Sequence, residues 1–110
     1  MELIQHFGEH GNEFGAATDT EYEALADAFW HDPKPAHVQE CRRRRGDILR
    51  FDPITQTLSA VDNKSVIRTF FKPIPCVSVT VPQRAAMKAA GRCHDYTDNL
   101  LYFQARCRQW

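Results

Sequence analysis

The chain has 110 residues and a mass of 12.7 kDa, which suits one domain with one hydrophobic core. Hydrophobic residues make up 43% and charged residues 25%, which excludes a collagen-like, low-complexity or disordered chain. The chain has no run of about 18 apolar residues, so no transmembrane helix is predicted. Its N-terminus also lacks the basic and apolar segments of a secretory signal peptide.

The formal net charge of zero hides an uneven distribution of charge. Residues 1–33 carry eight acidic side chains and no Lys or Arg, whereas residues 34–110 carry all 14 basic side chains and six acidic ones. The two parts therefore have formal charges of −8 and +8. Either the basic part binds a polyanion, or the two parts pack against each other. A run of adjacent arginines favours the polyanion, because phosphates would relieve their mutual repulsion: Arg42, Arg43, Arg44 and Arg45.

The first predicted elements are helices. Residues 2–10 have a weak helical pattern, and a loop is predicted for residues 12–18. The clearest helix covers residues 20–31, where apolar side chains recur at spacings of three and four. Thr20 and Glu23 have the spacing of a capping box at its start, and an Asp-Pro pair follows its end.

After residue 35 the apolar residues alternate with polar ones, as they do in strands. The connections are short, which favours an antiparallel meander. The predicted strands cover residues 38–44, 48–52, 57–61, 66–71 and 76–81. A helix is predicted for residues 82–90, because Pro begins it and Gly follows it. The segment from His94 onward is compatible with helix or strand.

Together these elements predict a single α+β domain over residues 1–110. Helices in the acidic part, 1–33, pack on one face of a four- or five-stranded antiparallel sheet in residues 36–81. Residues 82–110 form a C-terminal extension. The other face of the sheet is predicted to be free to bind a ligand. Arg50 points to the opposite face of its strand from its apolar neighbours.

The four cysteines are too few for a disulfide scaffold, and three pairings are possible. Buried free thiols or one disulfide are the expected states. Two Cys–His groups could be assembled into a zinc site, but neither has the spacing of a standard finger: His37 with Cys41, and Cys93 and His94 with Cys107. No metal or other cofactor is therefore predicted.

His6 and His10 are four residues apart, so a helix would place both on one face. Two imidazoles at one site can act as general base and general acid, because their ordinary pKa is about 6.5. Cleavage of RNA through its own 2′-OH needs such a pair and cations for the charged phosphorane, without a metal. The alternatives are two exposed surface histidines or a metal-binding pair. No motif supports another reaction class.

Three blocks of residues, taken in order, resemble a known group of toxin domains. The blocks contain H-F-G-E-H-G at 6–11, R-G-D and R-F-D at 45–52, and V-I-R-T-F-F-K-P at 66–73. They are similar to the C-terminal ribonuclease domains of bacterial polymorphic and contact-dependent growth-inhibition toxins. These domains have the barnase–EndoU–colicin–RelE fold. The resemblance covers residues 3–73 and leaves residues 74–110 outside it.

The resemblance implies an endoribonuclease that cleaves RNA, with tRNA as the expected substrate, without a metal, and leaves a cyclic phosphate. By position, His6 and His10 become the acid and base, Arg50 and Lys72 the cations, and Thr69 the hydroxyl that holds the scissile phosphate. The residues predicted to bind RNA are Arg42, Arg43, Arg44, Arg45 and Arg68. Alternation places Thr69 on the face of two apolar neighbours, a conflict that a β-bulge would resolve.

The resemblance also implies a cognate immunity protein that covers the active site. The domain would be a monomer apart from that complex, with no membrane contact, at the C-terminus of a secreted or cell-surface effector that acts in the target-cell cytoplasm. One alternative is a non-catalytic RNA- or protein-binding module that uses the basic face. Another is a DNA-directed nuclease or a different toxin activity, for which metal dependence would be the discriminating observation.

Overall fold

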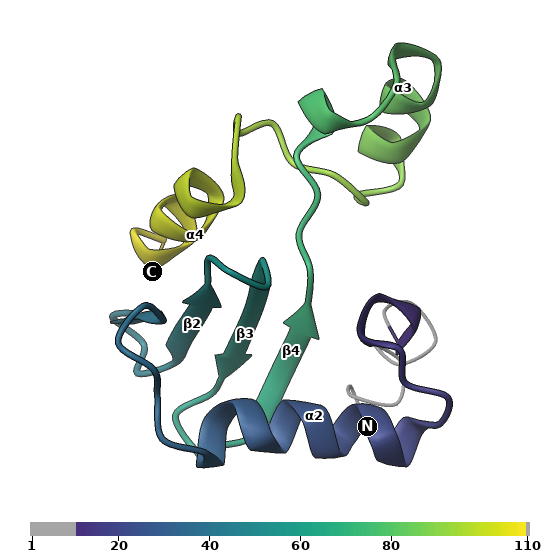
Figure 1. The fold of residues 1–110 in the computed structure, drawn as a ribbon. Coiled ribbons are helices and arrows are strands. Elements are labelled where there is room, and N and C mark those ends of the chain that lie inside the picture. Colours follow the sequence, from purple (N-terminus) through teal and green to yellow (C-terminus); the bar gives the residue numbers. More distant parts are fainter. Residues whose placement is uncertain (1–10, 110) are drawn as a thin grey trace.

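A computed structural model describes residues 11–109 and has the predicted α+β fold (Figure 1). Its elements in chain order are the 3-10 helix η1 (Gly11–Phe14), helix α2 (Asp19–His31), strands β1 (Gln39–Arg42), β2 (Ile48–Asp52), β3 (Thr57–Val61) and β4 (Ile67–Phe71), the 3-10 helix η2 (Cys76–Ser78), and helices α3 (Val81–Ala89) and α4 (Asn99–Cys107). The strands form one antiparallel sheet in the order β1-β2-β3-β4. The helix predicted for residues 2–10 lies outside the described residues.

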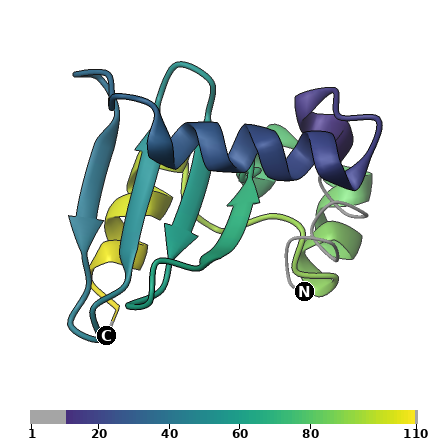
Figure 2. The same cartoon turned by 90° about the horizontal axis from the view of Figure 1, so that it is seen from below.

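Helix α2 covers one face of the sheet, and Figure 2 shows it crossing the strands. Its N-cap is Thr18, whose hydroxyl accepts a hydrogen bond from the backbone N–H of Glu21 at 3.1 Å. The Glu21 carboxylate in turn accepts from the backbone N–H of Ala17 at 2.7 Å. The predicted cap at Thr20 is therefore two residues too late. Thr18 and Glu21 are three residues apart, as are Thr20 and Glu23, so the spacing alone does not decide which threonine is the N-cap.

A small aromatic core joins α2 and η1 to the sheet. Tyr22 of α2 is fully buried, and its hydroxyl donates to the backbone carbonyl of Phe70 in β4. The ring of Phe14 in η1 stacks on the Phe70 ring, with centroids 4.2 Å apart. These contacts follow from the apolar stripe of α2, which must be buried against the sheet. They also fix η1 beside the end of β4.

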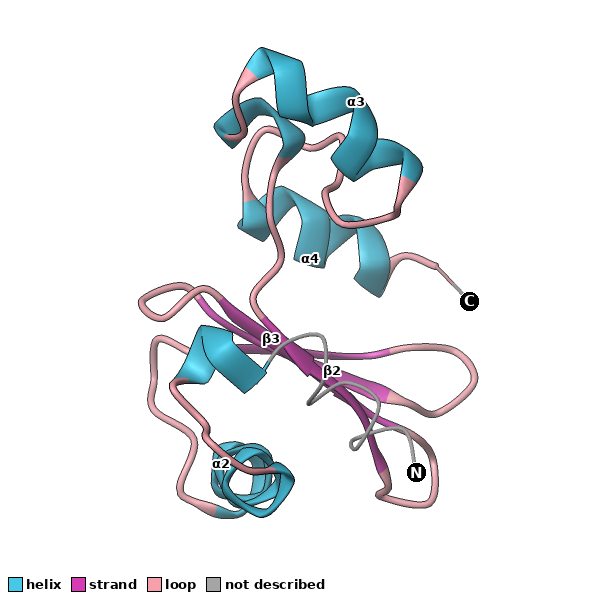
Figure 3. Ribbon diagram, turned by 90° about the vertical axis from the view of Figure 1, so that its right-hand side faces the viewer, coloured by secondary structure: helices cyan, strands magenta, loops and turns pink. Residues whose placement is uncertain are grey.

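The opposite face of the sheet is covered by α4, so the prediction of a free face was wrong (Figure 3). Phe103 of α4 stacks on Phe51 of β2 with ring centroids 5.7 Å apart, and both side chains are buried. A disulfide joins Cys41 in β1 to Cys107 at the end of α4. The alternation in β2 explains this cover, because Phe51 and its i−2 neighbour Leu49 both point to this face.

Residues 76–81, predicted as a fifth strand, form η2 and the beginning of α3 instead. A disulfide between Cys76 and Cys93 closes this segment, and the Arg84 guanidinium donates to two carbonyl groups within it. The valines that alternate here are largely solvent-exposed, as Val77 and Val81 show. The four cysteines thus form two disulfides, which corrects the expectation of free thiols or a single bridge.

A β-bulge in β4 places Ile67 and Thr69 on opposite faces of the sheet. The register between β3 and β4 shifts between Ala60 and Val61, so Arg68 is an extra residue in β4. The bulge turns Ile67 toward α2, whereas Thr69 remains on the α4 face.

None of the helices within residues 11–109 has the length and apolar composition needed to span a bilayer.

Candidate RNA-binding site

Basic side chains from three parts of the chain surround a pocket of about 740 Å³ on the α4 side of the sheet. They come from the β1–β2 turn, from the β3–β4 hairpin and from the C-terminal end of α4. We call this pocket the arginine pocket. It is lined by the cationic side chains Arg43, Arg45, Lys64, Arg68 and Arg106, by Thr69, and by the carboxylates Asp47 and Asp62.

The close approach of two turns builds one wall of the arginine pocket. Gly46 in the β1–β2 turn has a φ of +95°, a left-handed conformation that glycine adopts without steric cost. A Cβ at this position would lie 3.2 Å from the Cβ of Asn63 in the β3–β4 hairpin. Gly46 therefore lets the arginine-rich turn lie against the hairpin that carries Lys64.

Two arginines of the pocket are oriented by carboxylates. Arg43 Nε donates to Asp47 Oδ2 at 2.9 Å, and a terminal nitrogen of Arg43 contacts the same oxygen. Burial raises the pKa of Asp47, but the hydrogen bond and charge of Arg43 outweigh it, so the pKa lies below its ordinary value. Arg68 Nε donates to Asp62 Oδ2 at 3.0 Å. These pairs hold both guanidinium groups in fixed orientations at the pocket.

The arginine pocket carries more positive than negative charge. Five cationic side chains against two carboxylates leave an excess of three positive charges. A phosphate group suits such a pocket, because planar guanidinium groups form paired hydrogen bonds to phosphate oxygens. A nucleic-acid strand would supply several phosphates at once. The pocket can therefore hold a phosphodiester with the Thr69 hydroxyl nearby.

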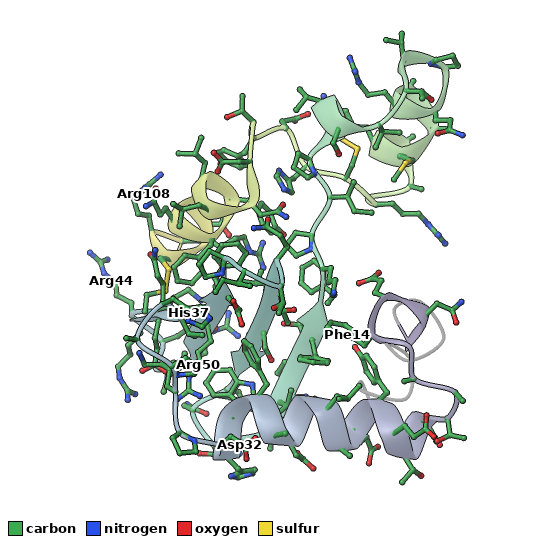
Figure 4. All side chains as sticks on the ribbon, in the orientation of Figure 1. Phe14, Asp32, His37, Arg44, Arg50 and Arg108 are labelled. Atoms are coloured by element: carbon green, nitrogen blue, oxygen red, sulfur yellow. A yellow bond between two sulfur atoms is a disulfide. The ribbon has the colours of Figure 1, made fainter. Side chains whose placement is uncertain are left out.

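The remaining residues predicted to bind RNA lie outside the pocket. Arg42 is exposed on β1, which is an edge strand of the sheet. Arg44 is also exposed, and its side chain points away from the body of the molecule (Figure 4). The structure thus brings Arg43, Arg45 and Arg68 together and leaves the other two arginines along the neighbouring edge.

Arg50, predicted as a phosphate-binding cation, is bonded to groups of the protein itself. Its Nε donates to Glu40 Oε1 at 2.5 Å, and a terminal nitrogen donates to the Phe29 carbonyl at 3.0 Å. Its guanidinium carbon lies 4.6 Å from the centroid of the Trp30 ring. The Arg50 side chain is only 15% exposed and faces α2, on the opposite side of the sheet from Thr69. These contacts join the end of α2 to the first two strands.

Lys72 lies at the other end of β4 from Arg68, in a second pocket of about 550 Å³ between η1, α2 and the sheet. We call this pocket the Lys72 cleft. The Lys72 ammonium lies 5.2 Å from the centroid of the Phe14 ring, and its backbone N–H donates to Glu13 Oε1 at 2.7 Å. Lys34 and Asp52 also line the cleft.

The predicted catalytic residues are therefore not gathered at one place. Thr69 lines the arginine pocket, Lys72 lines the cleft at the opposite end and face of the sheet, and Arg50 contacts α2. His6 and His10 lie outside the described residues, so their predicted role stays a prediction. Within residues 11–109, no group of three His, Cys, Asp or Glu side chains is placed to hold a metal ion.

Sequence analysis missed several residues of these two sites. Lys64 and Arg106 were not named as candidate site residues, and Arg106 lies in the segment from His94 onward, whose structure was left open. The clustering of arginines near the C-terminus was the available signal for Arg106. His37, considered only as a zinc ligand, instead lies with Nε2 at 3.2 Å from Asp52 Oδ1.

Comparison with known proteins gives this chain no family, since no family model matches it and no curated protein is similar to it.

Proposed function

We propose that this domain is a metal-independent endoribonuclease of the toxin type, which binds RNA phosphates in the arginine pocket. The observation that carries the proposal is the excess of three positive charges around one pocket of a chain whose net charge is zero. Arg43 and Arg68 are already oriented there by their carboxylates, so a bound phosphate would cost little side-chain entropy. The expected substrate class is structured RNA, with tRNA first.

The proposed reaction is attack of a ribose 2′-oxygen on the adjacent phosphorus. A general base takes the 2′-OH proton, and the 5′-oxygen leaves with a proton from a general acid. The products are a 2′,3′-cyclic phosphate and a 5′-OH. The resemblance proposes His6 and His10 as the acid–base pair, and Thr69 and Lys72 as contacts to the RNA strand. The internal bonds of Arg50 favour a structural role for that residue instead.

The proposed partner besides RNA is an immunity protein with an acidic surface that covers the arginine pocket. Its charge would complement the pocket and speed association. The proposed location is the C-terminus of a secreted or surface effector. The two disulfides support this location, because such bonds persist in oxidising compartments.

The test compares two double variants that remove the same side-chain types. Arg45→Ala/Lys64→Ala changes the arginine pocket, and Lys88→Ala/Arg92→Ala changes exposed residues on and just after α3. Each protein is incubated with total bacterial RNA in EDTA, and the fragments are resolved on a denaturing gel. The parent and the α3 variant should yield discrete fragments with cyclic-phosphate ends, whereas the pocket variant should lose cleavage about tenfold or more. Equal cleavage by both variants would show that the arginine pocket is not needed for RNA cleavage.

A non-catalytic RNA-binding module is the second candidate, favoured by the separation of Arg50, Thr69 and Lys72. Its signature would be intact RNA bound with an affinity that falls steeply as salt rises. The pocket variant should then reduce the slope of log affinity against log salt by about one to two. Addition of cell lysate separates this module from a ribonuclease that waits for a host factor.

A further inference from the structure

The lining of the arginine pocket includes an aromatic side chain beside its cations. Tyr102 of α4 is half-buried and lines the pocket. The guanidinium carbon of Arg106, one turn later in the helix, lies 6.0 Å from the centroid of the Tyr102 ring. A phosphate group is bound by cations and hydrogen-bond donors, and it gains little from the face of an aromatic ring. Tyr102 therefore suits another part of a nucleotide.

The charged and apolar residues of the pocket lie toward different ends of the strands. The cations Lys64 and Arg68 lie in the β3–β4 hairpin and at the beginning of β4. Leu58 and Phe71 also line the pocket, and they pair at the end of the β3–β4 ladder farthest from that hairpin. Tyr102 packs against the core cluster that contains Leu58. The pocket thus has a cationic end for a phosphate and an apolar end for a base.

A second aromatic ring supports Tyr102. The imidazole of His94 and the Tyr102 ring are nearly parallel, with an interplanar angle of 7° and centroids 4.2 Å apart. His94 therefore covers one face of the tyrosine ring, and the ring contributes its remaining surface to the pocket. Successive aromatic layers of this kind continue readily into a stacked nucleobase, because every base has a flat π-face.

Hydrogen bonds at both ring nitrogens fix the His94 imidazole. Its Nδ1 accepts from the backbone N–H of Tyr96 at 3.2 Å, so the neutral ring carries its proton on Nε2. That nitrogen lies 2.7 Å from Asn99 Oδ1 and donates to it. Asn99 is buried, and its amide nitrogen donates to the Pro73 carbonyl at 2.9 Å, which sets the orientation of the amide. A support fixed in this way keeps the Tyr102 ring oriented before any ligand binds, which lowers the entropy cost of stacking.

We infer that the arginine pocket binds one nucleotide of an unpaired RNA segment, with its phosphate at the cationic end and its base stacked on Tyr102. The inference rests on the proposed binding of RNA in this pocket, and it adds the requirement for an accessible base. Bases in a duplex are already paired and stacked, whereas loop nucleotides expose a face that an aromatic side chain can cover. Arg106 lies beside the same ring, and a guanidinium group also stacks on a base. The substrate class is therefore a single-stranded loop of structured RNA.

The first test uses the parent protein and two strands that cannot be cleaved. One is a short, fluorescein-labelled 2′-O-methyl oligouridylate, which lacks the 2′-OH needed for cleavage. The other has the same backbone and charge but no bases. Fluorescence anisotropy should give about tenfold tighter binding of the strand with bases, a size typical of one base–aromatic stack. Equal affinity for the two strands would overturn the inference.

The second test assigns this preference to Tyr102. Tyr102→Leu keeps an apolar side chain against the core but removes the ring, so the preference for bases should disappear while the affinity for the abasic strand stays parental. Tyr102→Phe restores the ring and should restore the preference. An undiminished preference in Tyr102→Leu would overturn the assignment.

Tyr96→Leu is the matched control for these variants. Tyr96 is 41% exposed, and its ring centroid lies 6.1 Å from that of Tyr102. It is not among the residues of the described chain, 11–109, that line the arginine pocket. Tyr96→Leu should therefore keep the parental preference for the strand with bases, and loss of that preference would contradict stacking on Tyr102 alone.

A crosslinking experiment needs no variant, so it applies even if Tyr102→Leu fails to fold. A bromouridine-containing strand, irradiated in complex with the parent protein, should attach to Tyr102, which mass spectrometry of the peptides would identify. Attachment at other residues only would overturn the inference. A parent protein that prefers the strand with bases but cleaves no RNA would support the base site and overturn the ribonuclease proposal. A parent protein that binds neither strand would overturn both.

Discussion

Cys41 in β1 is joined by a disulfide to Cys107 at the end of α4, a residue 66 positions later in the chain. The bond fixes the C-terminal helix over the face of the sheet that carries Phe51. This face was predicted to be open, so the disulfide and the helix together account for its burial. The arginine pocket lies beside the C-terminal end of this helix, because Arg106, which lines the pocket, directly precedes Cys107.

The two disulfides should contribute unequally to stability. A chain-entropy model gives about 4 kcal/mol for the loop closed by Cys41 and Cys107 and about 3 kcal/mol for the 17-residue separation of Cys76 and Cys93. Urea unfolding of Cys41→Ser/Cys107→Ser and Cys76→Ser/Cys93→Ser measures the two losses side by side. A larger loss in the second variant would contradict the loop-length argument.

The ion pair of Arg43 and Asp47 should make stability depend on acid pH. The folded-state pKa of Asp47 lies below its unfolded value, so its contribution is present above about pH 3.9 and is lost as pH falls through the folded pKa. Asp47→Asn should therefore lower the free energy of unfolding by about 2 kcal/mol at pH 7 and by much less at an acid pH below the folded-state pKa of Asp47.

Urea unfolding at both pH values checks this expectation. Asp95→Asn is the control, because Asp95 forms an exposed pair with Lys88 and such pairs contribute little. A difference between Asp47→Asn and the parent that persists unchanged at low pH would show that the carboxylate charge is not responsible.

The buried hydroxyl of Ser59 should contribute to the stability of the fold. Its hydroxyl accepts from Trp30 Nε1 at 2.8 Å and donates to the Thr69 carbonyl at 2.6 Å, and the residue is fully buried. Ser59→Ala leaves the indole N–H without this acceptor, so the free energy of unfolding should fall by about 1–3 kcal/mol. Ser78→Ala removes an exposed hydroxyl bond to Pro75 and should have a much smaller effect in the same urea titration.

The position of the helix cap can be tested with two neighbouring threonines. Thr18→Ala removes the hydroxyl that accepts from Glu21 and should cost about 1 kcal/mol. Thr20→Ala changes an exposed residue inside the first turn and should be neutral or slightly stabilising, because alanine favours helix. Thermal unfolding followed by circular dichroism compares the two variants. A larger loss of stability in Thr20→Ala than in Thr18→Ala would show that Thr20 is the N-cap.

The spacing of apolar residues predicted those helices and strands that are specified by their own residues. The apolar stripe of α2 and the alternation in β2 and β3 each specify a buried face, and these elements were confirmed with bounds within about two residues. The strand predicted from the alternating valines at 76–81 was wrong, because a strand also needs a partner strand. Within residues 11–109 this segment joins no sheet, and the nearest pairing is an isolated bridge between the preceding Pro75 and His94. The conflict in alternation around Thr69 indicated a bulge in this strand, but it did not identify Arg68 as the extra residue.

The candidate site was predicted in part. The arginine run singled out Arg43 and Arg45, and Arg68 was predicted to bind RNA with them; the structure brings these three together. Arg50 could not be excluded from the site by sequence, because its partner Glu40 is chosen by the pairing register of β1 and β2. Such cross-strand partners depend on how two distant segments align, which no local pattern specifies.

The acidic side chains of α2 and the arginine pocket lie on different sides of the sheet. Helix α2 carries Asp19, Glu21, Glu23 and Asp27 on one side, and the arginine pocket lies on the other. A molecule with this arrangement has no net charge but a substantial dipole moment. The field of an approaching polyanion would rotate it until the pocket faces the strand, so encounter would be oriented before any contact forms. Salt would weaken this orientation at a pH where the protein itself is neutral.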